Sequence, residues 1–228
     1  MPQRDARIAP LRTGGTLVEL GFKALVAYLL GSVIGSLALG RLKGVDIRTQ
    51  GSGNAGGTNA LRTQGWVFAL GVVVVDVGKA LLAVGWLPNA DFAGVGRDAA
   101  VERDWLVVAC ASAVVIGHVY PVWFGFRGGK GAATLVGAVL VLAPLALVPV
   151  VGVWLLTVML TGYVGLGTML GTATLPVYFA LETPHRVPLV VFGLLMAAFI
   201  AYTHRSNLQR MRAGNENRAR RLWLLRPR

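Results

Sequence analysis

The stretch AATLVGAVLVLAPLALVPVVGVWLLTVMLTGYVGLGTMLGTATLPVYFAL, residues 132–181, decides the fold because it contains no charged side chain. A helix needs roughly 20 apolar residues to cross the hydrocarbon core of a membrane, so this stretch is too long for one span. It has room for two full spans, or for three if some are short or broken. The candidate breaks are prolines and glycines: Pro144, Pro149, Gly152, Gly162 and Pro176.

Four shorter apolar runs surround this block, at residues 24–40, 66–87, 105–126 and 187–203. The chain of 228 residues is 55% hydrophobic and 14% charged, and its mean hydropathy is +0.63. An ordinary globular domain of this length is less apolar. We therefore expect an all-α integral membrane protein, a polytopic helical bundle whose membrane domain covers residues 24–204.

The two ends of the chain lie outside this predicted membrane domain. Residues 1–23 form an N-terminal extension of unknown role, and residues 205–228 form a basic tail. The formal net charge of +12 would suit a nucleic-acid partner, but the chain carries no interleaved aromatic residues and no nucleic-acid-binding module. We interpret the tail as a cytoplasmic segment that follows the positive-inside rule, and we expect no nucleic acid partner.

The charges of the loops predict the orientation in the membrane. The loop after the first run is mainly basic, with Arg41, Lys43, Arg48 and Arg62 against Asp46. Residues 88–104 are mainly acidic, with Asp91, Asp98, Glu102 and Asp104 against Arg97 and Arg103. Because cytoplasmic loops are enriched in lysine and arginine, the first loop is expected inside and the second outside. A cytoplasmic tail then requires an odd number of spans, and three spans in the long block give seven in total.

The loop GSGNAGGTNALR, residues 51–62, is the first candidate for chemistry. Its glycines permit unusual backbone dihedrals and a close approach, so several N–H groups can point at one anion. Gly51, Gly53 and Gly56 spell G-x-G-x-x-G, but no strand precedes them and no dinucleotide fold is expected. The alternative interpretation is a flexible connector.

The loop GHVYPVWFGFRGGKGAAT, residues 117–134, is the second candidate. Arg127 and Lys130 lie among glycines directly before an apolar run. If that run begins a helix, its free N–H groups and positive dipole end adjoin Lys130, which favours anion binding. The loop is not a Walker A sequence, and the alternative interpretation is a positive-inside anchor.

Further polar residues lie at the ends of the spans and within one of them. His204 and Asn207 follow the last run and share a helix face. His118 and His185 are interpreted as interfacial and loop residues. Asp76 and Lys79 are three apart in an apolar helix, where we favour structural pairing over substrate contact. The sequence shows no metal-ligand spacing, nucleophile elbow or paired carboxylates, so neither metal nor cofactor is expected. Three polar loops on one face predict a phosphate-bearing substrate.

The segments LKGVDIRTQGSGNAGGTNALR, DVGKA, GHVYPVWFGFRGGKGAAT and THRSNLQR with GNEN resemble, in the same order, the motifs of the bacterial membrane acyl-phosphate:glycerol-3-phosphate acyltransferases, the PlsY family. The resemblance implies seven membrane helices and an acyltransferase that uses acyl phosphate. It implies transfer to the sn-1 hydroxyl of glycerol 3-phosphate, giving lysophosphatidic acid and phosphate in phospholipid biosynthesis. Membrane lipid and an enzyme that makes acyl phosphate are the further partners implied.

The resemblance also implies which residues surround the substrates. Five matching polar residues are expected to be catalytic: Ser52, Arg62, Lys130, His204 and Asn207. Substrate-phosphate contacts are expected from Gly51, Gly53, Asn54, Asn59, Gly128, Gly129, Gly131, Thr168 and Glu216. Acyl phosphate carries a good leaving group, so positioning and charge stabilisation suffice without a strong nucleophile. The family further implies that the substrate's own phosphate helps to deprotonate the attacking hydroxyl.

Two departures from the family pattern keep other functions open. The chain reads YVGLGT where the family usually has Y-V-S-L-A-S, so Gly165 replaces a serine and Thr168 keeps one hydroxyl. Ser206 replaces a usual glutamate. The alternatives are a transporter or flippase for a phosphorylated solute, and a paralogue that binds substrate without turnover. Polar loops confined to one face, without an inverted repeat, favour the enzyme.

Overall fold

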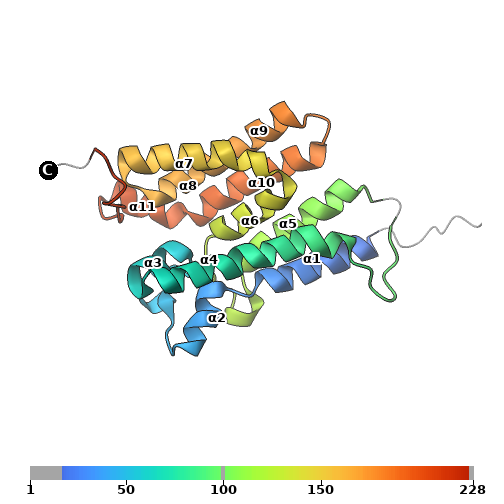
Figure 1. Ribbon diagram of the computed structural model, residues 1–228, viewed down its shortest axis with the longest axis horizontal. Coiled ribbons are helices and arrows are strands. Elements are labelled where there is room, and N and C mark those ends of the chain that lie inside the picture. Colours follow the sequence, from blue (N-terminus) through green and yellow to red (C-terminus); the bar gives the residue numbers. More distant parts are fainter. Residues whose placement is uncertain (1–16, 99–100, 226–228) are drawn as a thin grey trace, which may run out of the picture.

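The computed structural model describes residues 17–98 and 101–225, and these residues are almost entirely helical (Figure 1). The only β pairing in this part of the chain is an isolated bridge between Phe92 and Val95. The helices are α1 (Val18–Gly31), α2 (Gly35–Leu42), α3 (Gly57–Gln64), α4 (Trp66–Leu81), α5 (Arg103–Val119), α6 (Ala132–Leu142), α7 (Leu147–Thr161), α8 (Val164–Thr172), α9 (Thr174–Glu182), α10 (Val187–Thr203) and α11 (Arg205–Arg212). The predicted all-α architecture is confirmed.

The helices form two groups that meet along α5, α6 and α10. In Figure 1, α1, α4 and α5 lie in the lower group and α7 to α10 in the upper one, with α6 between them. Helices α1 and α5 pack closely because glycines face each other's backbones: a Cβ at Gly31 would overlap Val114, and one at Gly117 would overlap Tyr28. Small residues at helix crossings are typical of membrane bundles.

The outer surface of the bundle is apolar, as lipid requires. Large apolar side chains point outward, and Leu156 and Leu194 are 57% and 56% exposed. Only 11% of the span Pro144–Thr161 is buried inside the protein. In water such a surface would be a large exposed apolar patch, whereas in a bilayer it is solvated by acyl chains. The chain is therefore a multi-pass membrane protein.

The first span differs from the sequence prediction at its start and in its middle. Helix α1 begins at Val18, six residues before the predicted apolar run, and it buries Glu19 and Lys23. The predicted domain boundary at residue 24 stays a prediction. The ion pair between Glu19 and Lys23, 2.8 Å long, is joined by Arg103, so the buried carboxylate of Glu19 is paired with two cations. The predicted run 24–40 is also not one helix, since α1 and α2 are bent by 46° at a break.

The long apolar block divides at only some of its prolines and glycines. Pro144 opens a short 3-10 turn between α6 and α7, and Gly162, at φ +78°, ends α7. Pro149 and Pro176 lie in the first turns of α7 and α9, where a missing N–H costs nothing. Gly152 lies inside α7 and does not interrupt it.

The number of spans depends on how the bent helices are counted. Among the described residues, four helices are long and apolar enough to cross a membrane, or up to six if each bent pair is one span. The bent pairs are α1 with α2 and α10 with α11. Seven spans would require the shorter apolar helix α6 to cross as well. The count of seven therefore stays a prediction.

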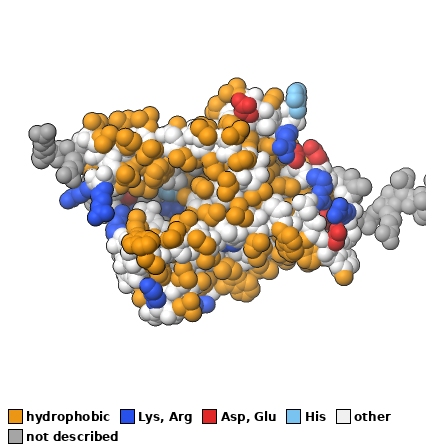
Figure 2. Space-filling view, in the orientation of Figure 1, with side chains coloured by type: hydrophobic (Ala, Val, Ile, Leu, Met, Phe, Trp, Pro, Cys, Tyr) orange, Lys and Arg blue, Asp and Glu red, His pale blue; other side chains and the backbone are white. Residues whose placement is uncertain are grey.

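Charged side chains gather at the two ends of the bundle. Figure 2 shows blue side chains with almost no red ones at the end that carries α3 and α11 in Figure 1, and most of the red side chains, mixed with further blue ones, at the opposite end. Contacts also group the loops by end. Arg48 Nη1 donates to the carbonyl oxygen of Arg127 at 3.1 Å at one end, and Arg186 Nη2 pairs with Asp104 at 2.7 Å at the other.

Candidate active site

The first glycine loop, residues 51–57, is held in shape by the side chain of Asn59. Its buried amide Nδ2 donates to two carbonyl oxygens, each at 3.0 Å, and its Oδ1 accepts the N–H of Ser52 at 2.9 Å. Gly51 has a φ of +56°, and a Cβ there would overlap Asn59 Oδ1. Asn59 therefore uses its polar atoms on the loop itself, and its predicted contact with a phosphate stays a prediction.

Three other predicted residues of this region keep polar groups available. The side chain of Ser52 is half-buried and that of Arg62, on α3, is exposed. No hydrogen bond is formed by the Ser52 hydroxyl or the Arg62 guanidinium with the residues that the structure describes. Gly53 has a φ of +71°, and the Asn54 amide lies beside the backbone of Gly56. The polar side chains named here are free to receive an anion. The N–H of Gly53 is not, because it donates to the carbonyl oxygen of Gln50 at 3.0 Å.

In the second glycine loop, residues 127–131, the backbone donors are partly occupied. Gly128 N–H donates to the carbonyl oxygen of Val119 and Gly129 N–H to that of His118, each at 3.1 Å. Gly131 precedes α6 with a φ of +88°, and no side chain caps the helix. The first N–H groups of α6, rather than those of Gly128 and Gly129, are therefore the donors available to an anion.

A polar cluster forms around Lys130, where α11 is bent by 48° from the end of α10. Lys130 Nζ donates to the Ser206 hydroxyl at 3.2 Å and to Asn207 Oδ1. Asn207 Nδ2 donates to Glu216 at 2.7 Å, and Arg210 pairs with the other oxygen of Glu216 at 2.6 Å. The structure thus brings together three predicted site residues, Lys130, Asn207 and Glu216, from segments far apart in the sequence.

The environment of this cluster tunes its charge. Burial lowers the pKa of Lys130 to about 8, and the positive charge of Arg210 adds to this effect. His204, buried beside the cluster, has its Nδ1 2.8 Å from the carbonyl oxygen of Ile200. A carbonyl only accepts, so Nδ1 carries the proton and Nε2 is left with a lone pair.

Gly165 and Thr168 of α8 lie in different surroundings. A Cβ at Gly165 would be 2.8 Å from Cγ of Asn207, so the missing side chain is what lets Asn207 pack here. The Thr168 hydroxyl donates to the carbonyl oxygen of Val164 at 2.9 Å, and Thr168 lines an apolar groove rather than the Lys130 cluster. Its predicted contact with a phosphate stays a prediction.

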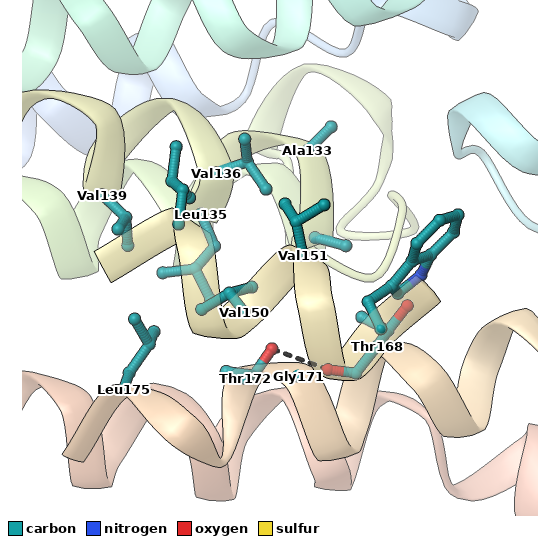
Figure 3. A pocket seen from close by; sticks show the side chains of 13 residues that line it. Ala133, Leu135, Val136, Val139, Val150, Val151, Thr168, Gly171, Thr172 and Leu175 are labelled. Carbon is teal, nitrogen blue, oxygen red and sulfur yellow. Dashed lines mark hydrogen bonds between the residues drawn. The ribbon is translucent and has the colours of Figure 1, made fainter. Parts of the chain in front are cut away.

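An apolar groove of about 180 Å³ runs between α6, α7 and α8 (Figure 3). Ala133 and Thr168 lie at one end of it, and Val139 and Leu175 at the other. Ala132, the first residue of α6, also lines it, so the groove begins beside Lys130. The sequence analysis did not identify this groove, because helix packing rather than a motif creates it.

Arg48 connects the two glycine loops, and the sequence analysis did not assign it a role. Its Nη1 donates to the carbonyl oxygens of Phe124 and Arg127, at 3.2 and 3.1 Å. Its Nη2 pairs with Asp46 at 2.7 Å, and this hydrogen-bonded guanidinium lowers the pKa of the Asp46 carboxyl. The only sequence feature that could have indicated this role is the position of Arg48 beside a glycine-rich segment.

Within the described residues, no hydrogen bond joins Ser52 or Arg62 directly to the Lys130 cluster.

Comparison with known proteins identifies close relatives. A sequence model of the family described as glycerol-3-phosphate acyltransferase matches residues 22–214. A glycerol-3-phosphate acyltransferase from Chlorobaculum parvum is 37% identical over 218 residues, which cover 85% of this chain and 93% of the relative. One from Chlorobaculum tepidum is 36% identical over 219 residues, covering 85% and 94%.

Two solved structures are similar over nearly the same length. Both are crystal structures of PlsY, an integral membrane glycerol 3-phosphate acyltransferase. The glycerol 3-phosphate form gives a TM-score of 0.74 at 33% identity, covering 87% of this chain and 94% of that one. The lysophosphatidic acid form gives a TM-score of 0.71 at 32% identity over the same shares. At this identity the likeness extends beyond the fold to the sequence.

Proposed function

Because the chain belongs to the glycerol-3-phosphate acyltransferase family, we propose that it transfers a fatty acyl group from acyl phosphate to the sn-1 hydroxyl of glycerol 3-phosphate. The products are lysophosphatidic acid and inorganic phosphate. The observation that supports this choice of donor is that a candidate anion site adjoins an apolar groove: Ala132, the first residue of α6 and two residues after Lys130, lines the groove. Acyl phosphate has the matching shape, one phosphate attached directly to an apolar tail.

The phosphate of the donor is assigned to the first turn of α6. The free N–H groups of that turn and the dipole of an 11-residue helix favour a negative charge there. Lys130 supplies a full positive charge beside them, and Asn207 and Ser206 orient its ammonium group. The acyl chain then follows the groove between α6, α7 and α8.

Glycerol 3-phosphate is assigned to the polar groups that the protein itself leaves unpaired. The Ser52 hydroxyl and the exposed Arg62 guanidinium are available for its phosphate or its hydroxyls. Arginine binds phosphate oxygens through two parallel N–H groups, which fixes the orientation as well as the charge. Asn59 and Arg48 act indirectly, by holding the first glycine loop in shape and beside the second one.

The chemical step needs positioning rather than a protein nucleophile. The sn-1 oxygen attacks the acyl carbonyl carbon, and the bond between that carbon and the bridging phosphate oxygen breaks. The bond's electron pair leaves with inorganic phosphate, and the hydroxyl proton moves to a phosphate oxygen. Lys130 and the α6 N–H groups stabilise the charge that develops on the leaving phosphate. Holding both reactants in place lowers the barrier further, because a bimolecular encounter becomes a local one.

The site is assigned to the cytoplasmic face of the membrane. The end of the bundle that carries both glycine loops is rich in basic residues, whereas the described part of the acidic segment between α4 and α5 lies at the other end (Figure 1). This asymmetry follows the positive-inside rule. Both substrates are anionic and water-exposed at their phosphates, so they reach the basic end directly from the cytoplasm.

The experiment compares acyl donors with the purified protein in lipid nanodiscs. We expect lysophosphatidic acid and inorganic phosphate in equal amounts from palmitoyl phosphate, and no product from palmitoyl-CoA. Product from palmitoyl-CoA alone would overturn the acyl phosphate proposal but not the family activity. No product from either donor, with the protein folded, would overturn the enzyme proposal and favour transport or binding.

Two variants and a matched control then test the site. Lys130→Ala and Ser52→Ala should each lower kcat/KM by at least about a hundredfold, the usual cost of losing one charge-stabilising group. Arg97→Ala removes a basic residue at the opposite end, where its pair with Asp91 is exposed and contributes little. Its activity should equal that of the wild type.

A further inference from the structure

A buried charged network lies where the first span breaks, and the mechanism above does not use it. Lys79 Nζ donates to the carbonyl oxygens of Gly31 and Val33, at 2.9 and 2.8 Å, and pairs with Asp76 at 3.0 Å. Asp76 in turn accepts the N–H of Gly35 at 3.1 Å. The predicted structural pairing of Asp76 and Lys79 is thus confirmed: the lysine caps the end of α1 and the aspartate caps the start of α2.

His118 is the member of this network that reaches the glycine loops. Its Nδ1 lies 2.9 Å from Lys79 Nζ and 3.0 Å from the hydroxyl of Thr134, and its side chain is almost fully buried. Asp76 lies on the same side of the ring, with a carboxylate oxygen 3.4 Å from Nδ1. Because the ammonium group of Lys79 is nearer to Nδ1 than this carboxylate, we assign the lone pair to Nδ1 and the proton of the neutral imidazole to Nε2.

The Nε2 edge of His118 lies against Gly129 of the second glycine loop, at a point where Ala55 of the first loop is also close. A Cβ at Gly129 would overlap this nitrogen, so the ring packs directly on the second loop. The same Cβ position is 3.2 Å from the carbonyl oxygen of Ala55, in the first loop. That carbonyl already accepts the Ser36 hydroxyl at 2.9 Å. Within the described residues no hydrogen-bond partner occupies Nε2.

His118 also fixes the second loop through its backbone. Its carbonyl oxygen accepts the N–H of Gly129 at 3.1 Å, immediately before Lys130. One residue therefore holds the chain just before the catalytic lysine and faces the first glycine loop with its ring. Its own orientation is set by Lys79, which is anchored to the end of α1.

We propose that His118 is a positioning residue that fixes the spacing of the two glycine loops, with its Nε2–H directed at the first loop through Ala55. The inference rests on the proposed function, since the two loops are the ones assigned to the two substrates. A change in their spacing alters the distance between the attacking hydroxyl and the acyl carbonyl. The expected consequence is a lower kcat with little change in either KM.

Two substitutions separate this role from a purely structural one. An asparagine side chain places an acceptor where Nδ1 lies but does not reach Nε2, whereas a glutamine reaches Nε2 and loses the Nδ1 acceptor. His118→Asn should melt near the wild-type temperature and lose at least tenfold in kcat with KM unchanged within twofold. His118→Gln should melt lower yet keep a higher kcat per folded molecule than His118→Asn.

Opposite results overturn the proposal. If His118→Asn keeps the wild-type kcat, Nε2 has no positioning role. If His118→Asn does not fold, the kcat of folded His118→Gln decides: a value within threefold of the wild type supports the proposal, and a lower one overturns it.

A third test concerns the position of the proton on the His118 ring. Isotope-labelled histidine NMR should show His118 neutral and protonated on Nε2, and a proton on Nδ1 would overturn the proposal even if the protein transferred no acyl group. The proposed function fails separately, when the wild type makes no product.

Discussion

At the scale of single residues, Lys130 links the site to pH. Burial and the nearby charge of Arg210 lower its pKa from an ordinary 10.5 to about 8, so the side chain loses its proton as pH rises through about 8. In the proposed mechanism, the neutral amine would no longer attract the phosphate of the acyl donor. We therefore expect kcat/KM for palmitoyl phosphate to fall above a pH of about 8, as measured in steady-state assays across this range.

The fall in kcat/KM at alkaline pH, the alkaline limb of the pH profile, can be assigned to Lys130 by substituting this residue. Arginine stays charged throughout the accessible range, so the residual activity of Lys130→Arg should show no alkaline limb near pH 8. Bound phosphate favours the charged amine, so in the wild type the limb of kcat should lie at higher pH than that of kcat/KM. An unchanged limb in Lys130→Arg would show that another group titrates.

Gly165 is a second residue with a definite consequence. Because a Cβ there would be 2.8 Å from Cγ of Asn207, Gly165→Ala should displace the amide that links Lys130 to Glu216. We expect kcat/KM to fall by at least about tenfold, equivalent to about 1.4 kcal/mol of transition-state stabilisation. Overpacking should also lower the melting temperature.

The matched control is Gly152→Ala, in a helix where a Cβ meets nothing within 4 Å. It should leave activity unchanged and stability equal or higher, because alanine favours a helix over glycine. Wild-type activity in Gly165→Ala would mean that the placement of Asn207 does not limit the reaction.

The sequence analysis identified the polar residues of the candidate site but not their hydrogen-bond partners. Lys130, Asn207 and Glu216 were predicted from the family pattern, and the structure joins them in one cluster. The hydrogen bonds of the Asn59 side chain to the backbone of its own loop could not be predicted, because they depend on the positive φ values of the nearby glycines. A side-chain amide suits either role, and only the local backbone decides between them.

At the scale of elements, the segment after α11 stabilises the end of α7. This strap, residues 217–225, supplies donors to three carbonyl oxygens that the helix leaves unpaired. Ala219 N–H donates to Gly162 at 2.7 Å, Trp223 Nε1 to Leu160 at 3.1 Å, and Leu224 N–H to Met159 at 2.9 Å. The strap therefore does more than supply the positive charge predicted for it.

Removing one anchor of the strap should be measurable. Arg218 lies 4.1 Å from the ring of Trp223, so Trp223→Ala loses this cation–π contact together with its hydrogen bond. The expected cost is about 1 to 2 kcal/mol, or a few degrees in the melting temperature in a fixed detergent. Arg220→Ala, a neighbouring exposed change, should leave the melting temperature unaltered. Equal melting temperatures for the two variants would contradict the capping role.

Breaks within the spans show what composition can and cannot predict. Pro144 and Gly162 end helices as expected, because one removes a donor and the other adopts a left-handed conformation. Pro149 and Pro176 look identical in the sequence but fall in first turns, where they are tolerated. The break between α1 and α2 was not predicted, since Asp76 and Lys79 of another helix stabilise it.

At the scale of the whole molecule, the sequence predicted a bundle in lipid because its apolar runs are long and its charges lie between them. The sequence also predicted in part which loops lie at the same end of the bundle, since basic loops are expected on one side of the membrane and acidic loops on the other. Which loops touch could not be predicted, because the contact of Arg48 with the second glycine loop depends on the 46° bend between α1 and α2. The groove arises in the same way, from the packing of three helices.

The orientation of the helical bundle in the membrane can be tested directly. Thr58 lies on α3 at the basic end and Ala93 lies in the acidic segment, and both are exposed and uncharged. Single cysteines at these positions therefore report each end without changing the loop charges that set the orientation. Cys110, the chain's only cysteine, is buried and provides an unreactive background.

In intact bacterial cells, a membrane-impermeant maleimide should label Ala93→Cys, whereas Thr58→Cys should react only after the inner membrane is opened. This pattern follows if the basic end, with both glycine loops, faces the cytoplasm, where soluble glycerol 3-phosphate can enter without crossing the bilayer. Labelling of Thr58→Cys from outside would invert the bundle. The substrates would then have to arrive from the other side, and the positive-inside argument would fail for this chain.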